Sequence, residues 1–123
     1  MIAIDTSSLL RWAGRKSGVD VDQVREAVRN GEAALPPIVL TEALSKPALE
    51  LVFVSVVTSL GLMSIREGYW KRAGELRSDI LSEGYKAKLA DVLIAQSCID
   101  HDVPLITYDA DFRHFTRAGL KLA

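Results

Sequence analysis

The sequence has few of the residues that build several common kinds of site. Cys98 is the only cysteine, so an intrachain disulfide and a zinc site made of several thiolates are both excluded. There is no excess of basic charge, because 15 basic residues face 16 acidic ones. Binding to nucleic acid would therefore require a local basic patch. The scarcity of cysteine suits a reducing compartment.

A long apolar segment is also missing. The uncharged stretch 51–65 is apolar, but a membrane-spanning helix needs about 20 residues, so we expect this stretch to belong to the core. The N-terminus lacks the basic start and apolar segment of a signal peptide. The composition predicts a single globular domain over residues 1–123, located in the cytoplasm and without contact with a membrane.

Short apolar runs alternate with helical patterns along the chain. Segment 49–60 is compatible with a strand, because it is rich in β-branched residues, or with a buried helix, which we favour. The alternation predicts an α/β fold whose sheet is mostly parallel. Strands are predicted at 1–4, 33–35, 62–65, 105–108 and 120–122. Helices are predicted at 6–14, 20–30, 37–42, 67–83, 91–100 and 110–115.

Some details of these helices can also be predicted. The hydroxyls of residues 6–8 are expected to cap the N-terminus of the first helix. Cys98 is expected to be buried, whereas His101 and His114 are expected at the surface rather than as ligands. We expect Trp12, Phe53 and Trp70 to be core or interface anchors. The predicted inner face of helix 67–83 consists of Trp70, Ala73, Leu76, Ile80 and Leu81.

Four acidic residues lie in or beside apolar runs, where carboxylates are rare. Asp5 and Asp109 each follow a predicted strand, Asp91 opens a helix, and Glu42 lies within the apolar segment 37–44. Because the carboxyl ends of parallel strands meet at one edge of a sheet, Asp5 and Asp109 would face the same cleft. Asp91 would benefit from the positive end of its helix dipole.

Such a cluster of carboxylates requires a compensating positive charge. Two carboxylates about 4 Å apart repel each other by roughly 4 kcal/mol at an effective dielectric near 20. The cluster must bind protons, basic side chains or a metal ion, and no Lys or Arg adjoins any of the four acids in sequence. Ligands that are all oxygen favour Mg²⁺ or Mn²⁺, ions that commonly serve phosphate chemistry.

Each acid also has a simpler explanation as part of a turn, a helix cap or an ion pair. These explanations are a turn or cap at Asp5, an ion pair of Glu42 with Lys46, a favourable first-turn position for Asp91, and a turn followed by a cap at Asp109 and Asp111.

The chain resembles the PIN-domain ribonucleases and, among them, the VapC-type toxins of bacterial and archaeal toxin–antitoxin pairs. The resemblance covers nearly the whole chain and is carried by four motifs that occur in order. They are Ile4-Asp-Thr-Ser-Ser-Leu-Leu10, Glu42 after Val39-Leu-Thr41, Ala90-Asp-Val-Leu-Ile-Ala95 and Leu105-Ile-Thr-Tyr-Asp-Ala-Asp-Phe112.

The resemblance implies a three-layer PIN-like sandwich with a central, mostly parallel sheet of four to five short strands flanked by helices. It implies an endoribonuclease that hydrolyses RNA phosphodiester bonds with a water activated by Mg²⁺ or Mn²⁺, forms a homodimer, and is inhibited by a cognate antitoxin protein. The metal ligands implied are Asp5, Glu42, Asp91 and Asp109, with Asp111 as a further acidic position used by some members. Ser7 and Thr107 match polar positions near the metal.

Two positions depart from the family pattern. The glycine that often follows the glutamate a few residues later is absent, and Tyr108 occupies a position that is often basic or polar. Neither departure removes a ligand, so they concern RNA contacts and helix packing. The basic residues close to catalytic segments, and hence candidates for binding RNA, are Arg11, Arg15, Lys16, Lys86, Lys88 and Arg113.

Two other functions remain compatible with the sequence. One is a metal-binding PIN-like regulatory or scaffold module without turnover. The other is a receiver-type domain that accepts phosphate, which has a similar size and α/β alternation. Against the receiver, the first strand is followed by a single Asp, and the strand at 62–65 leads into Arg66 rather than an Asp.

Overall fold

The structure is a computed structural model that describes residues 1–123. Its centre is a five-stranded sheet with the order β3-β2-β1-β4-β5, in which every neighbouring pair is parallel. The strands are β1 (Ile2–Ile4), β2 (Ala33–Leu35), β3 (Gly61–Leu62), β4 (Pro104–Ile106) and β5 (Lys121–Leu122). The sheet confirms the predicted α/β class and parallel topology.

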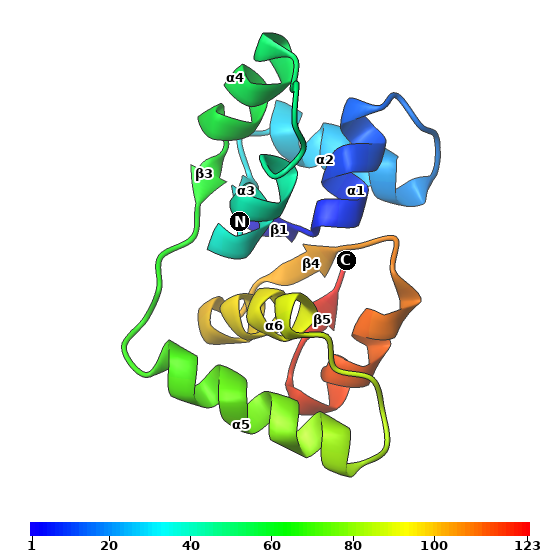
Figure 1. Ribbon diagram of the computed structural model, residues 1–123. Coiled ribbons are helices and arrows are strands. Elements are labelled where there is room, and N and C mark those ends of the chain that lie inside the picture. Colours follow the sequence, from blue (N-terminus) through cyan, green and yellow to red (C-terminus); the bar gives the residue numbers. More distant parts are fainter.

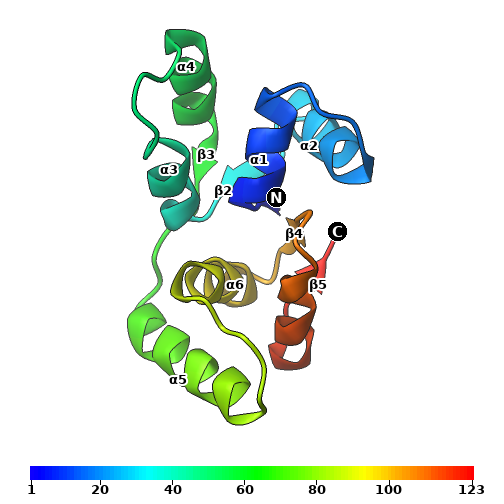
Figure 2. The ribbon, with the colours of Figure 1, turned by 45° about the vertical axis from the view of Figure 1, so that its right-hand side comes forward.

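Helices cover both faces of the sheet. Figures 1 and 2 show α1 and α2 on one side of it and α5 and α6 on the other. The predicted three-layer sandwich is therefore confirmed. The helices are α1 (Thr6–Ala13), α2 (Val19–Arg29), α3 (Pro37–Ala43), α4 (Leu51–Ser59), α5 (Tyr69–Ser82), α6 (Leu89–His101) and the 3-10 helix η1 (Ala110–Ala118).

The two central strands form the middle of the core. Ala3, Ile4, Leu105 and Ile106 are all fully buried, as expected for parallel strands covered on both faces. Because the strands are so short, each one begins and ends within the core. The residues that directly follow β1 and β4 therefore lie at the carboxyl edge of the sheet, between the two helical layers.

Helix α3 connects the two layers at this edge. It begins with Pro37, whose fixed φ suits the first turn of a helix, and it contacts α1, α6 and β2. Val39 and Ala43 form its buried side. This packing holds the C-terminal half of α3, including Glu42, beside the strand ends.

The third strand is shorter than predicted. A strand was expected over 62–65, but β3 covers only Gly61–Leu62 at the edge of the sheet. The Met63 N–H still donates to the Leu35 carbonyl at 2.9 Å, after which the chain leaves the sheet toward α5. Of the apolar side chains in segment 62–65, only that of Met63 is buried.

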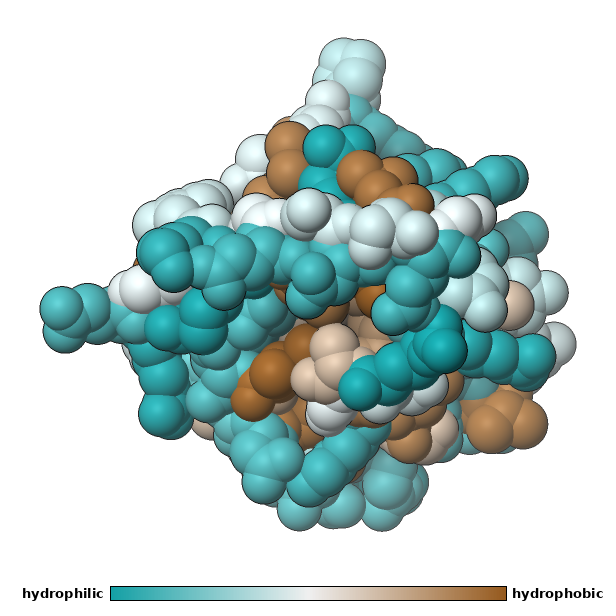
Figure 3. Space-filling model, turned by 90° about the horizontal axis from the view of Figure 1, so that it is seen from below, coloured by the Kyte–Doolittle hydropathy of each residue, from teal (hydrophilic) through white to brown (hydrophobic).

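The buried face of α5 also differs from the prediction. Trp70 and Leu81 were assigned to it, but they are 67% and 48% exposed. Because α5 packs mainly on α6, only a narrow stripe is covered, and Tyr69 rather than Trp70 starts it. Seen from below, the molecule presents a mainly hydrophilic surface with apolar atoms gathered in a recess (Figure 3). The buried residues of α5 are Tyr69, Ala73, Leu76 and Ile80.

Segment 49–60 forms a helix, as favoured, but it is not the core segment that was predicted. Only Val57 of α4 is buried, while Leu51 and Val52 are 86% and 73% exposed. The helix contacts little besides α3 and lies at one end of the molecule (Figures 1 and 2). No helix combines the length and the apolar composition needed to cross a bilayer.

Candidate metal centre

Asp5 and Asp109 come from adjacent parallel strands, as the sequence predicted. Ile4 at the end of β1 pairs with Ile106 at the end of β4. The Asp5 N–H continues this ladder by donating to the Ile106 carbonyl at 2.9 Å. The chain then turns away on both strands, so that the segments beginning at Asp5 and Thr107 lie against each other.

Two hydroxyls orient the Asp5 carboxylate, which is buried. Ser7 Oγ and Thr107 Oγ1 donate to its Oδ2 atom at 2.6 and 2.8 Å. Burial raises the pKa of Asp5 above its usual range, the two hydrogen bonds oppose that rise, and the charge of Asp109 adds to it. The predicted supporting roles of Ser7 and Thr107 thus correspond to direct contacts with this carboxylate.

Thr107 also links Asp5 to Asp109. Its Oγ1 accepts the Asp109 N–H at 3.0 Å while it donates to Asp5. Asp109 Oδ1 in turn accepts the Asp111 N–H at 2.9 Å and caps η1, so the turn-and-cap explanation for this segment is correct as a description of its backbone. The Asp111 side chain is half-buried in the first turn of η1.

Glu42 reaches the same region from α3. Its Oε1 atom accepts a hydrogen bond from Thr6 Oγ1 at 2.6 Å, and it forms no ion pair with Lys46. Thr6 was missed as a residue of the site. The signal available in the sequence was a hydroxyl directly after Asp5.

The predicted capping role of residues 6–8 is wrong. The side chain of none of them caps α1, because all three hydroxyls donate to carboxylates instead. The third of these bonds joins Ser8 Oγ to Asp20 Oδ2 at 2.8 Å. The start of α1 therefore serves to orient acidic side chains.

Asp91, in the first turn of α6, is the most perturbed acid of the cluster. Burial raises its pKa to about 6, and the charges of Asp5, Asp109 and Glu42 contribute to the rise, while Lys88 opposes it. These charge effects show that all four predicted acids lie within electrostatic reach of one another. Folding has therefore brought together residues that are up to a hundred positions apart in sequence.

Two enclosed carboxylates outside the cluster, Asp20 and Asp100, are compensated by arginine. Burial alone would raise the pKa of Asp20 and Asp100, but hydrogen bonds and charge from Arg11 and Arg72, respectively, hold both below the usual range. The corresponding N–O distances are 3.0 Å and 2.6 Å. In contrast, none of the ion pairs of the chain includes an acid of the cluster. The cluster is thus the one group of enclosed acids without a basic partner.

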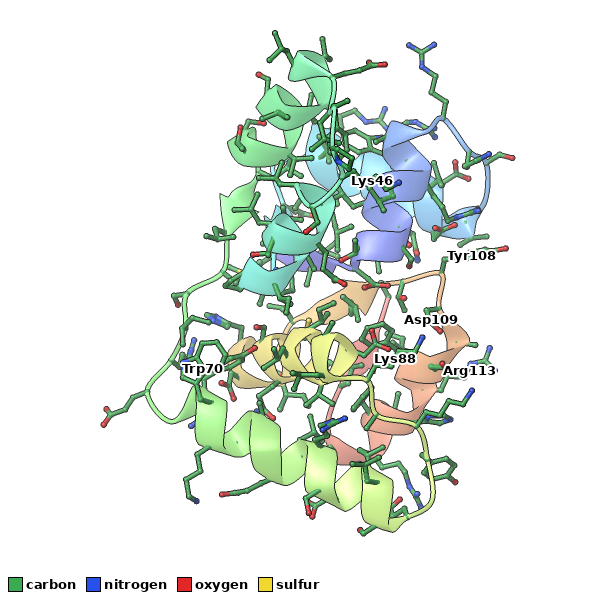
Figure 4. All side chains as sticks on the ribbon, viewed as in Figure 1. Lys46, Trp70, Lys88, Tyr108, Asp109 and Arg113 are labelled. Atoms are coloured by element: carbon green, nitrogen blue, oxygen red, sulfur yellow. The ribbon has the colours of Figure 1, made fainter.

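Among the predicted RNA-binding cations, Arg11 already has partners inside the protein. It pairs with Asp20, donates to the Ser17 carbonyl at 2.8 Å and covers the Tyr108 ring. The other candidates are exposed and make no ion pair; they are Arg15, Lys16, Lys86, Lys88 and Arg113. Figure 4 shows Lys88 and Arg113 on the same side of the molecule as Asp109.

The remaining candidates for chemistry have structural partners. Cys98 is buried as predicted, and burial raises its pKa to about 12. His101 and His114 are half-buried rather than at the surface. His101 lies 2.9 Å from the Ser64 carbonyl, and the His114 ring stacks on Tyr85 with 4.5 Å between centroids. Neither histidine belongs to the acidic cluster.

The PIN domain family matches residues 2–118 of the sequence. The chain belongs to the PIN domain family. Over its whole length the fold is similar to a chain in the crystal structure of VapBC2 from Rickettsia felis bound to a DNA fragment from their promoter. The TM-score is 0.76 at 20% sequence identity, and the match covers 98% of that chain. None of the curated proteins matches the sequence.

The acids of this PIN domain suit a divalent cation by their chemistry and charge. They provide oxygen atoms only, and the raised pKa values of Asp5 and Asp91 indicate that an added positive charge would be favourable there. As positioned, no three acidic, histidine or cysteine side chains converge closely enough to hold one ion.

Proposed function

We propose that this PIN domain is an endoribonuclease dependent on Mg²⁺ or Mn²⁺ and acts as the toxin of a VapBC-type toxin–antitoxin pair. The observation that carries the proposal is the contrast between two kinds of carboxylate. Asp20 and Asp100 have arginine partners and lowered pKa values, whereas Asp5 and Asp91 have neither. The missing positive charge is the one that a divalent cation would bring.

Each residue of the site has a proposed role. Asp5 and Asp91, with Asp109 and Glu42, would hold the ion directly or through water. Thr107 bonds both the Asp5 side chain and the Asp109 backbone, and so holds the two segments together. Ser7 donates a second hydrogen bond to the Asp5 carboxylate. When bound, the ion would neutralise phosphate charge and lower the pKa of a water molecule. Asp111 remains a proposed additional ligand.

The direct test is cleavage of RNA by the purified protein with Mg²⁺, with Mn²⁺ and with EDTA. Asp5→Asn should abolish cleavage, because it removes a charged ligand without changing the shape of the side chain. Asp79→Asn is the matched control, since Asp79 is exposed on α5 and far from the cluster in the fold. Cleavage that continues undiminished in EDTA, or in Asp5→Asn, would overturn the mechanism.

A second candidate function is a PIN-like module that binds metal without turnover. It is favoured by the absence of a preformed ligand set. A rise in the midpoint temperature of unfolding on addition of Mg²⁺, with no cleavage of any RNA tested, would establish it. The receiver-type alternative is disfavoured, because β1 lies at the centre of this sheet rather than next to one edge as in flavodoxin-like folds.

The proposed antitoxin requires an apolar docking surface, and α4 supplies one. A hollow of about 630 Å³ lies between the end of α1 and α4, with Trp12, Val52, Phe53 and Val56 among the residues that line it. Exposed apolar surface of this kind is typical of protein–protein contacts. We propose that an apolar segment of the antitoxin binds there, and that the pair acts in the cytoplasm.

The proposed homodimer would use a different face. Exposed Trp70 and Ile65 lie beside a second apolar hollow of about 190 Å³ between α3 and α5. Trp70 lies on the opposite side of the molecule from Asp109 in Figure 4, so dimerisation there would leave the cluster open. Light scattering of wild type and Trp70→Glu tests this proposal, with a monomeric variant as the expected outcome.

A further inference from the structure

The Tyr108 side chain lies beside the acidic cluster and bonds none of its carboxylates. Tyr108 joins Thr107 to Asp109, and its own N–H donates to Ser7 Oγ at 3.4 Å. The residue is 64% exposed, which is unusual for an aromatic side chain that neighbours a buried strand.

The orientation of the Tyr108 ring is fixed from one side by Arg11. The guanidinium carbon lies 3.8 Å from the ring centroid, the geometry of a cation–π contact. Arg11 is itself fixed, because its Nε atom donates to the buried Asp20 at 3.0 Å and its Nη2 atom to the Ser17 carbonyl. One face of the ring is thus occupied by a rigid group, and the remainder is presented to solvent.

A small hollow adjoins Tyr108 between the ends of β4 and β5 and the start of η1. It measures about 180 Å³, and its lining includes Thr107, Tyr108, Asp109, Arg113 and Leu122. Pockets for drug-sized ligands begin at about 300 Å³, so this hollow suits a single planar group rather than a folded peptide. Figure 4 shows Tyr108, Asp109 and Arg113 together on one side of the molecule.

We propose that the Tyr108 ring stacks on a base of the RNA next to the scissile phosphate. The inference rests on the proposed nuclease function. Stacking on an aromatic ring requires a base that has left its duplex, because both faces of a paired base are covered by its neighbours. Arg113 and Lys88, which make no ion pair, lie where they can contact the flanking phosphates.

The test measures binding and stacking separately from cleavage. A short single-stranded RNA carrying 2-aminopurine is titrated against protein with Asp91→Asn as a non-cleaving background. Stacking quenches the fluorescence of this base. Tyr108→Phe should preserve both affinity and quenching, whereas Tyr108→Leu should weaken binding by about tenfold or more and abolish the quench. Leu81→Ala, at an exposed apolar position of α5, should change neither.

Two further measurements make the result decisive. A fully paired duplex of the same sequence should compete poorly. If circular dichroism shows that Tyr108→Leu is unfolded, the RNA is changed instead of the protein. A series of RNAs, each with one base replaced by an abasic site, is titrated against the folded Asp91→Asn protein. An abasic site at one position should lower the affinity by the same factor of about ten. Equal affinity and quenching for Tyr108→Leu and Tyr108→Phe, or no sensitive position in the abasic series, would overturn the proposal.

The two proposals fail in different ways. Without nuclease function, wild type shows no metal-dependent cleavage, whatever Tyr108 does in the binding assay. Without stacking, wild type, Tyr108→Phe and Tyr108→Leu cleave single-stranded RNA with the same KM and kcat. With stacking, the loss in Tyr108→Leu falls mainly on KM, because the ring touches a base and not the reacting phosphate.

Discussion

At the scale of single residues, the enclosed carboxylates differ in the groups that bond them. Asp20 and Asp100 have arginines, while Asp5 has only neutral hydroxyls. A hydroxyl orients a carboxylate without neutralising it. Thr107 joins two acids of the cluster, since it bonds both the Asp5 side chain and the Asp109 backbone.

Thr107→Val keeps the shape of the side chain and removes both hydrogen bonds. We expect cleavage to fall by about 10- to 100-fold, the usual cost of losing a group that orients a metal ligand. Thr116→Val, on the exposed part of η1, is the control, because its hydroxyl bonds only the nearby Arg113 carbonyl. Initial rates of cleavage give the comparison, and equal rates for the two variants would show that Thr107 does not position the site.

The sequence was informative about the acids and less so about their neighbours. Asp5, Glu42, Asp91 and Asp109 could be identified because carboxylates beside apolar runs are chemically conspicuous. The role of Thr6 depends on α3 reaching the start of α1, and that of Tyr108 on where Arg11 is anchored. Contacts of this kind join distant parts of the chain, so no local pattern contains them.

At the scale of the elements, hydrophobic periodicity predicted almost every helix and strand. It was less reliable about which side is buried. The predicted face of α5 was offset by one residue at Trp70, and α4 was expected in the core although only Val57 is buried. Burial depends on whether a neighbouring element arrives to cover an apolar side chain, and the composition of a helix does not determine that.

One ion pair joins α5 to α6, in addition to the buried apolar stripe of α5. Arg72 contacts both oxygens of Asp100, at 3.0 and 2.6 Å, and the Asp100 side chain is only 7% exposed. Arg72→Met should lower the free energy of unfolding by about 1–3 kcal/mol, because it leaves an enclosed carboxylate with a single amide donor, Gln96. Urea unfolding measures the loss.

The control for this change is an ion pair in solvent. Arg25 pairs with Asp22 three residues before it in α2, with both side chains more than half exposed. Arg25→Met should cost less than about 1 kcal/mol, as most exposed pairs do. If the free energy of unfolding falls by the same amount in Arg72→Met and Arg25→Met, the Arg72–Asp100 pair does not stabilise the contact between α5 and α6 more than an exposed pair would.

Helix α4 can be tested as a docking surface with a pair of matched variants. Val52→Asp places a charge in the apolar hollow beside Phe53, whereas Thr58→Asp places the same charge at another exposed position of the same helix. We expect only Val52→Asp to weaken the complex with the co-expressed antitoxin, by about tenfold or more, since a buried unpaired charge is costly. Calorimetric titration measures the affinity, and equal affinities would place the antitoxin elsewhere.

At the scale of the whole molecule, the cluster gives the metal-free protein an unusual response to pH. Asp5 and Asp91 hold their protons more tightly in the folded chain than in the unfolded one. Their effect on stability is therefore most favourable at low pH and is lost as the pH rises from the ordinary value of 3.8 to about 6. Asp20 and Asp100 act in the opposite sense, and their contribution is lost only as the pH falls below that ordinary value.

We therefore expect the metal-free protein to lose stability as the pH rises across the window from 3.8 to about 6. Asp91→Asn should reduce this loss and make the protein more stable than wild type in EDTA near neutral pH. Urea unfolding in EDTA on either side of the window provides the measurement. If the free energy of unfolding instead rises with pH across this window, and equally for wild type and Asp91→Asn, the clustered carboxylates do not destabilise the folded chain.

The pairing of β1 with β4 sets when the nuclease can become active during synthesis. Asp5 is translated about a hundred residues before the strand that holds its neighbours in place. A nascent or prematurely terminated chain that stops after α6 contains Asp5, Glu42 and Asp91 and still lacks both Thr107 and Asp109. The site is thus completed only after β4 and the segment that follows it have been translated.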